Sequence, residues 1–392
     1  MLNFDFYAPA RILLGRGEEK RIGALLKPHA SKVLLHYGAG SIQKSGLYDT
    51  VTASLKESGV AFVELGGVKP NPRLSLAHEG IALCKREGVD LILAVGGGSV
   101  IDSAKAIAMG VFYDGDVWEV YERGEPIEKA LPVATILTIP AAGSESSGDT
   151  VITNEEKSLK YGYGSPHLRP LLSIMNPELF CTLPEHQLAN GVADMMSHVF
   201  ERYFTHTEHT DLTDGLCETV LKTLMRNALL AKQDMQSYDA WAELGFAGTV
   251  AHNGLVGMGR RQDWSCHVME HELSALYDVA HGAGLAVLTP GWMQYVYRDN
   301  VPMFVQFAVN VMGVEGSFRD PDAVVQEGIA RLREFFRKMG LPSTLSEIGI
   351  GEERLEEMAK KATGAAFGEE QPIGGLKELY WQDVLNIYRS VK

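Results

Sequence analysis

The first 183 residues alternate between short apolar runs and longer stretches in which apolar side chains recur every three or four positions. Runs rich in β-branched and other apolar residues predict strands at 32–37, 61–65, 91–95, 133–137 and 171–174. The helical periodicity predicts helices at 47–58, 74–87 and 99–109, among others. Strands that alternate with helices in this way are typical of a parallel sheet in an α/β fold.

The pattern changes after Leu183-Pro184, where the strand signal fades and long segments with a period of 3.6 residues take over. The clearest segment spans 323–339, and Gly340 and Pro342 follow it as stop signals. At 392 residues the chain also exceeds the usual size of a domain with a single core. We therefore predict an α/β domain over 1–183 and an all-helical domain over 184–392.

Composition narrows the classes of partner. The formal net charge of −14 and the pI near 5.4 argue against nucleic acid and anionic membranes, and favour a small soluble molecule. The sequence has no apolar run of membrane-spanning length, and its first residues lack the features of a signal peptide, so we expect a cytoplasmic protein. The four cysteines form no Cys-x-x-Cys pair, which argues against a disulfide scaffold and a thiolate zinc site.

One acid and four histidines lie within 88 residues of sequence, at Asp194, His198, His267, His271 and His281. The first two residues are four positions apart, as are His267 and His271, and residues with this spacing share one face of a helix. Two helices that each present such a pair can hold a divalent cation between them. The pattern therefore predicts a metalloenzyme.

The spacing of the histidines also predicts a break in the helix. On one straight helix His267 and His281 would lie roughly 21 Å apart, whereas nitrogens that bind one metal ion each lie about 2 Å from it. We therefore expect the helix to end within 277–280 and His281 to begin the next one. Since a catalytic site keeps one coordination position open, we assign His267 and His281 as ligands and place His271 beside the site as a proton relay. The alternative that His271 is itself a ligand stays open.

A second motif follows the strand at 91–95 directly. Gly96-Gly97-Gly98-Ser99 leads into a helix that also carries Asp102. Glycine lets the backbone approach a ligand closely, and the amides and dipole at a helix start favour a phosphate group. We therefore predict that this segment, from Gly96 to Asp102, binds the pyrophosphate of a dinucleotide. The alternative is a tight turn between strand and helix, since the motif matches neither of the common phosphate-loop patterns.

The strand at 133–137 is also followed by small and hydroxylated residues. Because neighbouring strand ends in a parallel sheet open onto one crevice, Thr138 and Ser144 are candidates for the same nucleotide site. Lys160 is a further candidate, since a lysine can reach a ribose or a phosphate. The alternatives are a plain polar loop and a solvated lysine.

Together these segments resemble the iron-containing (group III) alcohol dehydrogenases, most closely the branch of butanol dehydrogenases and broad-range aldehyde reductases. The resemblance spans nearly the whole chain in consistent order. It rests on the Gly-Gly-Gly-Ser-Val-Ile-Asp-Ser-Ala-Lys segment, the Ala-Gly-Ser-Glu loop at 142–145, and the segments at 183–198, 267–272 and 280–282.

The resemblance implies a dinucleotide-binding domain and a helical domain of dehydroquinate synthase-like architecture, with iron or zinc held in a cleft between them, and a homodimer. The family's metal ligands fall on Asp194, His198, His267 and His281, in agreement with the assignment from spacing. One departure is Ala142, where the family commonly has threonine. It places a hydroxyl contact to the nicotinamide in doubt.

Cofactor preference is predicted from the end of the first strand. Gly38 stands where NAD-selective proteins place a carboxylate on the ribose hydroxyls, so a 2′-phosphate would not be repelled. Similar family members with glycine at this position accept NADP(H), and Ser41 and Lys44 can supply donors. We therefore expect NADP(H) to be favoured over NAD(H).

The predicted reaction is hydride transfer between NAD(P)H and small aliphatic aldehydes or primary alcohols, such as butanal and butanol. The proton reaches the alkoxide from His271, from water or from a cofactor hydroxyl. The alternatives are a polyol or lactaldehyde-type dehydrogenase of the same fold, a cyclising lyase and a non-catalytic nucleotide-binding protein. A lyase needs cations for a phosphorylated substrate, and Arg260 and Arg261 are the only lysine or arginine residues within 251–290.

Overall fold

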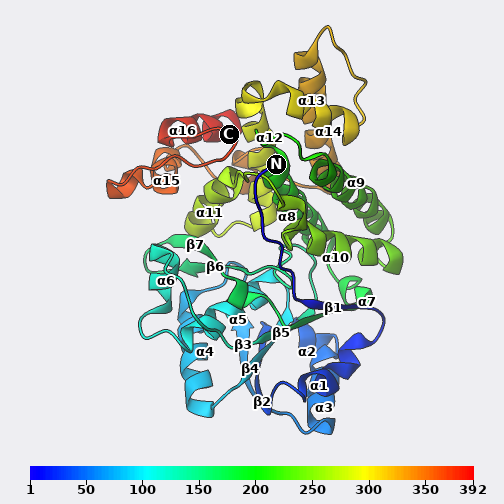
Figure 1. Cartoon of the computed structure of the whole chain (residues 1–392), viewed down its shortest axis with the longest axis vertical. Helices are drawn as coiled ribbons and strands as arrows, with labels where there is room; N and C mark the ends of the chain where they lie inside the picture. The colour runs from blue at the N-terminus through cyan, green and yellow to red at the C-terminus, as the bar shows by residue number, and fades with distance from the viewer. The chain divides into compact units, whose positions relative to one another are not determined.

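The computed structural model describes all 392 residues, which form two compact units. The sheet unit consists of Tyr7–Leu183 and Gln236–Thr249. The helical unit consists of Met1–Phe6, Pro184–Met235 and Val250–Lys392. Figure 1 labels their elements. No helix of either unit has both the length and the hydropathy that a membrane span requires.

The sheet unit contains six parallel strands in the order β1-β8-β5-β4-β2-β3. Their bounds are β1 Arg11–Leu14, β2 Lys32–Gly38, β3 Ala61–Val68, β4 Leu91–Gly96, β5 Val133–Leu137 and β8 Leu172–Met175. Five of the six correspond to predicted strands and differ from them by at most three residues at an end. The α/β class predicted for this part of the chain is confirmed.

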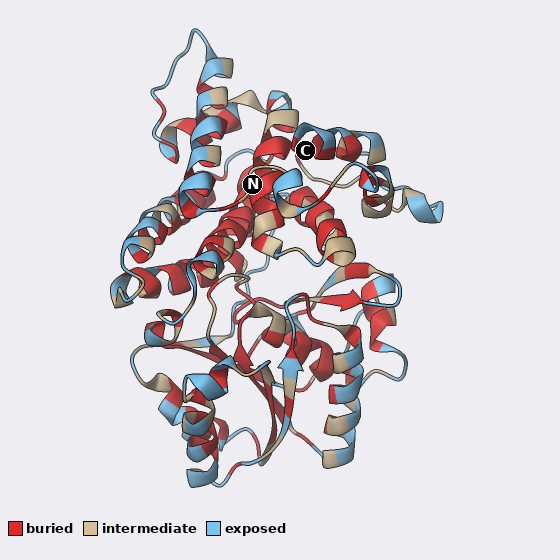
Figure 2. Ribbon diagram, turned by 180° about the vertical axis from the view of Figure 1, so that it is seen from behind, coloured by how far each residue is buried: buried red, intermediate tan, exposed pale blue.

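The sheet is covered on both faces, as its continuous apolar strands require. Every residue of β4 and β5 is buried. Helices α1 (Ile22–Leu26) and α3 (Leu47–Glu57) pack against one face, and α4 (Leu74–Glu87) lies on the other side of the strands in Figure 1. Figure 2 shows the central strands and the inward faces of the helices as buried, whereas the edge strands β1 and β3 are exposed or intermediate at most positions.

The strand order reverses between β2 and β4. The chain passes from β2 to the edge strand β3 and then returns to β4 on the opposite side of β2. The two strands end at Gly38 and Gly96 respectively. In an open α/β sheet, the carboxyl ends of strands at such a reversal are where nucleotides bind.

A hairpin formed by β6 (Asp149–Asn154) and β7 (Leu159–Gly164) was not predicted. It is attached to α5 (Gly98–Gly110) by Asp102, whose carboxylate accepts a hydrogen bond from the Val151 amide at 3.1 Å. The carbonyl of Asp102 accepts a second bond, from the Thr150 hydroxyl at 2.9 Å. The remaining helices of this unit are α2 (Ser41–Lys44), α6 (Val117–Arg123), α7 (Pro177–Phe180) and most of α10 (Tyr238–His252).

The helical unit contains no ladder of strands, as predicted for the second half of the chain. Its main helices are α8 (Glu185–Tyr203), α9 (Asp211–Gln233), α11 (Ser265–Tyr277), α12 (His281–Val296), α13 (Val301–Asn310), α14 (Pro321–Met339), α15 (Leu355–Ala362) and α16 (Trp381–Ser390). Helix α8 is buried along nearly its whole length from Leu188 to Tyr203. Aromatic side chains, among them Phe204, Trp292 and Phe304, fill the core beside it.

Two glycines at the start of α12 allow it to approach its neighbours closely. A Cβ atom added to Gly282 would lie 2.0 Å from the backbone oxygen of Asn190 in α8, and one added to Gly284 would lie 2.8 Å from Glu270 Cγ. The segment 281–284 is the first turn of this tightly packed helix, which begins at His281 as the spacing of the histidines predicted. Asn190 lies one turn before Asp194 in α8, so this contact places His281 close to Asp194.

Candidate metal centre and cofactor site

The four predicted metal ligands come together within the helical unit. Helix α8 supplies Asp194 and His198, α11 supplies His267, and α12 begins with His281. Oδ1 of Asp194 lies 3.5 Å from Nδ1 of His198, 3.7 Å from Nε2 of His267 and 3.8 Å from Nε2 of His281. Ligand atoms of Asp194, His267 and His281 all lie within 4.8 Å of one another. The ring of His198 stacks on that of His267, with centroids 4.7 Å apart.

The break between α11 and α12 occurs where the spacing required it. Helix α11 ends at Tyr277, and Asp278 adopts a left-handed backbone conformation with φ of 52°. Helix α12 then begins at His281. The reversal of direction lets two histidines that are fourteen residues apart face the same carboxylate.

Three of the converging atoms are polar, buried and without a hydrogen-bond partner: Asp194 Oδ1, His198 Nδ1 and His267 Nε2. Each such atom costs on the order of 1–3 kcal/mol unless something satisfies it. Burial raises the pKa of Asp194, but the imidazoles of His267 and His281 outweigh it, and the net shift is downward. An anionic oxygen beside imidazole nitrogens is a donor set that suits Zn²⁺ or Fe²⁺, so the residues fit a divalent cation.

Two buried glutamates bind Nδ1 of two of the predicted ligand histidines. Nδ1 of His267 donates to Glu201 Oε2 at 2.5 Å, and the backbone amide of His267 donates to Glu201 Oε1 at 3.0 Å. Nδ1 of His281 likewise donates to Glu270. Since a carboxylate can only accept, Nδ1 carries a proton in each ring, and Nε2 is the nitrogen left to bind a cation.

The electrostatic consequence is strongest at His267. Burial lowers the pKa of this imidazole, but the carboxylates of Glu201 and Asp194 outweigh burial and raise the pKa to about 9. The opposite holds for His198, where burial, together with the neighbouring imidazoles and Arg202, moves the pKa well below its usual value. A neutral His198 can offer a lone pair to a metal ion without losing a proton.

His271 lies beside the ligands and outside the group around Asp194. Its ring faces that of His281, with centroids 5.8 Å apart and an angle of 34° between the planes. Its nitrogen also lies within 4.8 Å of ligand atoms of Glu270 and His281. Its side chain is partly exposed, whereas the three residues around it on α11, His267, Glu270 and Glu272, are buried.

On the sheet unit, the predicted glycine turn is closely packed. An added Cβ would lie 2.4 Å from Val100 at Gly96, 3.0 Å from Ile139 at Gly97 and 2.8 Å from Ala142 at Gly98. The loop after β5 therefore lies directly over the turn, and glycine is needed for this contact as well as for any ligand. Ser99 lies in the first turn of α5, where the amides of Val100 and Ile101 donate to the Gly97 carbonyl at 3.0 and 3.2 Å. The amides of Gly98 and Ser99 are therefore the ones that a phosphate could accept from.

Asp102 and Ser144 meet in a buried network that the sequence did not predict. The Ser144 hydroxyl donates to Asp102 Oδ1 at 2.6 Å. The wholly buried ammonium of Lys105 donates to the Ser144 carbonyl at 2.7 Å, to the Ser144 hydroxyl at 2.8 Å and to the Asp149 carbonyl at 2.7 Å. Burial raises the pKa of Asp102 to about 6 although Lys105 opposes the shift. The network ties the loop at 143–149 to α5.

The other candidate cofactor residues lie at different places in the sheet unit. Gly38, at the end of β2, has room for a side chain, because an added Cβ would lie 3.6 Å from the Val68 carbonyl. Ser41 is exposed at the start of α2. The amide of Thr138 donates to the Gly96 carbonyl at 3.0 Å, which brings the ends of β4 and β5 together. Lys160 is buried in the β6–β7 hairpin and donates to Asn71 Oδ1 at 3.0 Å.

Comparison with known proteins identifies the family. Residues 9–177 match the model for iron-containing alcohol dehydrogenase, and residues 188–391 match the C-terminal model of the same family. NADH-dependent butanol dehydrogenase A of Clostridium acetobutylicum is 44% identical over 391 residues, which is 100% of both chains. This chain belongs to the iron-containing alcohol dehydrogenase family.

Two further relatives agree with this assignment. NADPH-dependent aldehyde reductase YqhD of Escherichia coli is 34% identical over 365 residues, 92% of this chain and 93% of the relative. The crystal structure of NADH-dependent butanol dehydrogenase A from Thermotoga maritima has a TM-score of 0.96 at 40% identity, covering 100% of this chain and 99% of the other. The predicted family, fold class and enzyme class, an NAD(P)-dependent alcohol dehydrogenase, are confirmed.

The family's members differ in the cofactor that their names give. NADH appears in the names of the butanol dehydrogenases and NADPH in that of the aldehyde reductase. These relatives support a metal ion and a nicotinamide cofactor in this protein. They do not choose between the two nicotinamide cofactors.

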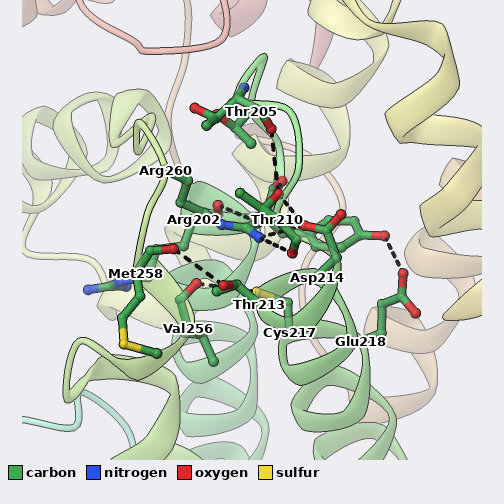
Figure 3. Close-up of polar contacts among 12 residues, drawn as sticks. Arg202, Thr205, Thr210, Thr213, Asp214, Cys217, Glu218, Val256, Met258 and Arg260 are labelled. Carbon is green, nitrogen blue, oxygen red and sulfur yellow. Dashed lines mark hydrogen bonds and ion pairs between the residues drawn. The ribbon is translucent and has the colours of Figure 1, made fainter. Parts of the chain in front are cut away.

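Arg260, one of the two arginines within 251–290, does not support a cyclising lyase. Arg260 is buried, and its guanidinium donates to the carbonyls of Arg202, Tyr203 and Thr210 and to the carboxylate of Asp214 at 2.5 Å (Figure 3). This arginine thus joins the end of α8 to the start of α9. A guanidinium that is engaged in this way cannot also bind a phosphorylated substrate.

Glu201 and Glu270 are the functional residues that sequence reasoning missed. Glu201 follows Asp194 by seven residues and His198 by three, and Glu270 follows His267 by three, so each shares a helix face with a ligand. That spacing is the signal that could have identified them. The spacing alone did not identify Glu201 and Glu270, because a glutamate within a helix is normally exposed to solvent.

Proposed function

We propose that this protein is a metal-dependent reductase of small aliphatic aldehydes that uses NAD(P)H and oxidises the corresponding primary alcohols in the reverse direction, with butanal and butanol as the model pair. The observation that carries the proposal is the set of buried, unpartnered ligand atoms around Asp194. The names of the relatives, which are butanol dehydrogenases and an aldehyde reductase, support the substrate class.

In this mechanism Asp194, His198, His267 and His281 hold the cation. When bound, a divalent cation supplies a Lewis acid that polarises a carbonyl oxygen, and the nicotinamide cofactor supplies the hydride. The Asp194 carboxylate contributes the negative charge of the ligand set. Glu201 and Glu270 keep Nδ1 of His267 and His281 protonated, so that both rings present Nε2 in a fixed orientation.

We assign proton exchange to His271. This imidazole is partly exposed and adjoins His281, and an imidazole exchanges protons with water near neutral pH. Reduction of an aldehyde requires one proton on the oxygen in addition to the hydride on carbon. His252 also adjoins the ligand set, with its ring centroid 4.0 Å from that of His198, but it is buried, whereas His271 is partly exposed.

For the cofactor we propose that NADP(H) is favoured over NAD(H). No carboxylate stands at position 38 to repel a 2′-phosphate, and Ser41 and Lys44 are exposed donors on the helix that follows. The phosphates are proposed to contact the turn from Gly96 to Ser99, which leads from β4 into α5. Comparison of kcat/KM for NADPH and NADH with a single aldehyde tests the preference, and a larger value for NADH would refute it.

The central experiment combines metal analysis with an activity assay. Protein purified without oxygen should contain about one Fe²⁺ or Zn²⁺ per chain, and it should oxidise NAD(P)H when butanal is added. His267→Ala should lose both the metal and the activity. His186→Ala is the matched control, because His186 is exposed on the same helix as Asp194. A His267→Ala protein with full metal content and normal turnover would contradict the ligand assignment.

A separate outcome tests the substrate class. If the metal-loaded protein reduces none of a panel of C2 to C6 aldehydes with either cofactor, the proposed reaction is wrong even though the metal site stands. The homodimer and the cytoplasmic location stay predictions. Sedimentation velocity of the purified protein tests the first of these.

A further inference from the structure

Trp264 has an unusual backbone conformation at the start of the helix that carries His267. It occupies the N-cap position of α11 with φ of 70° and ψ of 3°, in the left-handed region that bulky residues rarely adopt. Glycine adopts this conformation without strain, whereas tryptophan does not. The identity of the residue therefore has to be explained by its side chain.

The surrounding hydrogen bonds fix this backbone. The amide of Asp263 donates to the Glu201 carbonyl at 2.7 Å, and the amide of Ser265 donates to Asp263 Oδ1 at 3.0 Å. The other carboxylate oxygen of Asp263 accepts the amides of Gly375 and Leu376, both at 2.8 Å. Glu201, which is bound through its carbonyl here, is the same residue whose carboxylate holds His267.

The indole ring meets three histidines edge to face. Its centroid lies 5.2 Å from that of His267, 6.1 Å from that of His198 and 5.9 Å from that of His252, with interplanar angles of 69°, 65° and 82°. These separations are in the range in which aromatic rings attract each other. Two of the three histidines belong to the proposed ligand set.

Two polar contacts hold the indole in place. The guanidinium carbon of Arg202 lies 4.5 Å from the ring centroid, and the indole N–H donates to Gln262 Oε1 at 3.0 Å. Arg202 in turn donates to the carbonyl of His198 at 2.7 Å and to Nδ1 of His252 at 3.0 Å. The indole, Arg202 and His252 thus form one connected group around the ring of His198.

We propose that Trp264 is a positioning residue that fixes the rings of His198 and His267 in the orientation that the cation requires. This inference rests on the proposed metal site. It explains why a bulky aromatic residue occupies a backbone position suited to glycine: the helix start that places His267 also places the ring that holds it. The role differs from core packing, because the indole contacts three imidazoles and a guanidinium, and two of those imidazoles belong to the proposed ligand set.

The test uses Co²⁺ as the probe, because its visible absorption spectrum reports ligand geometry without any substrate. Trp264→Gly relieves the backbone strain and removes the ring. We expect it to unfold at the same temperature as the parent or a higher one, to release Co²⁺ to a chelator at least tenfold faster, and to show a changed Co²⁺ spectrum. A purely structural role predicts the reverse, namely lower stability and an unchanged spectrum.

Two further variants make the result decisive. Trp292→Phe is the control, since Trp292 is buried against Phe204 and Phe304 in the same unit, and it should leave the release rate and spectrum unchanged. Trp264→Phe keeps a smaller ring without the N–H, and its release rate should lie between those of the parent and the glycine variant. If the glycine variant does not fold, the phenylalanine variant decides.

A parental release rate and spectrum in the folded Trp264→Gly protein, or in Trp264→Phe when the glycine variant fails, would overturn the proposal. Failure of the metal site itself would be distinct, because the parent protein would then bind no Co²⁺. Failure of the proposed reaction would leave the Co²⁺ measurements unaffected.

Discussion

His271 and Glu270 are adjacent in sequence but contact His281 in different ways. Glu270 is fully buried and binds both Nδ1 of His281 and the hydroxyl of Ser274. His271 is partly exposed, and its ring faces that of His281. The buried carboxylate therefore fixes the ligand, whereas the exposed imidazole can exchange protons with solvent.

Substitution of His271 separates these two roles. His271→Ala should retain the parental metal content, because the residue lies outside the group around Asp194, but kcat for butanal should fall by about 10²-fold if the imidazole supplies the proton. Elemental analysis and steady-state kinetics measure the two effects, and His186→Ala again serves as the control. Loss of metal in the alanine variant would instead place His271 among the ligands.

Substitution of Gly38 tests the predicted preference for NADP(H) over NAD(H). An added Cβ meets only the Val68 carbonyl at an ordinary distance of 3.6 Å, so the site admits a side chain. Gly38→Asp should lower kcat/KM for NADPH relative to NADH by about tenfold or more, through repulsion of the 2′-phosphate. Gly38→Asn has the same size without the charge and should change the ratio far less. Equal effects of both substitutions would show that charge at this position does not set the preference.

Among individual residues, the sequence identified candidates whose side-chain type and spacing suggest a metal site. It missed residues whose role depends on being buried. Asp194 and His267 could be predicted as metal ligands because aspartate and histidine at helical spacing are typical of such sites, and the structure brings Oδ1 and Nε2 of these two residues within 3.7 Å of each other. Glu201 and Lys105 are charged residues that the sequence alone would place in solvent, and only the fold shows that both are buried and hydrogen-bonded. For Lys160 the sequence suggested a reach towards the cofactor, whereas the structure shows a hydrogen bond to Asn71.

The contact between α8 and α12 sets the position of His281. A Cβ at Gly282 would meet the backbone oxygen of Asn190 at 2.0 Å and its carbonyl carbon at 2.6 Å, so neither helix can yield by a side-chain rotation. Gly282→Ala should therefore push α12 away from α8 and destabilise the helical unit by about 1–3 kcal/mol. Chemical unfolding and metal retention should both reveal the change.

A glycine in an open position provides the control for this helix contact. Gly215 lies in α9, and an added Cβ there meets nothing within 4 Å. Gly215→Ala should stabilise the protein by up to about 1 kcal/mol, because alanine favours the helix. If both alanine variants had the same effect, close packing would not be the reason for glycine at position 282.

Among the elements, the sequence predicted those with an unambiguous period. Strand β4 and helix α14 are predictable because one is a continuous apolar run and the other repeats every 3.6 residues. The β6–β7 hairpin was missed because its strands mix polar and apolar residues and its place depends on the hydrogen bonds from Asp102 in a distant helix. Short elements that are held by tertiary contacts carry little signal of their own.

The stability of the whole molecule should depend on pH through a buried histidine. His36 in β2 is wholly buried, with Nδ1 2.8 Å from the Leu65 carbonyl and Nε2 2.9 Å from the Ser103 hydroxyl. A carbonyl can only accept, so Nδ1 carries the proton and Nε2 accepts from the serine. Burial lowers the pKa of His36 from 6.5 to about 4.

Because the pKa of His36 is lower in the folded protein than in the unfolded chain, the unfolded chain binds more protons between these two values. The contribution of His36 is therefore fully present above about pH 6.5 and is lost as the pH falls towards 4, by roughly 3 kcal/mol in total. His36→Gln lacks this titration, so its unfolding temperature should fall less than that of the parent between pH 7 and pH 4.5. Parallel pH profiles for the two proteins would contradict the assignment.

On the scale of the molecule, the sequence predicted an α/β class followed by helices because the change of periodicity after Leu183 is abrupt. It could not predict that the chain crosses between the units more than once. Met1–Phe6 precede that change but belong to the helical unit. Gln236–Thr249 follow it but belong to the sheet unit. Membership of a unit depends on long-range contacts, which local periodicity does not record.

The carboxylate of Asp263 links the start of α11 to amides that lie 112 and 113 positions further along the chain. The backbone at Gly375 and Leu376, within the last twenty residues, therefore supports the start of the helix that carries His267. A truncation that removes Gly375 and Leu376 would free one end of that helix, and a purification tag at the carboxyl terminus would sit on the same segment. Protein for metal analysis should accordingly retain Gly375 and Leu376 and carry no tag, because the amino terminus is also bound, with the Met1 amine donating to the Glu208 carbonyl at 2.6 Å.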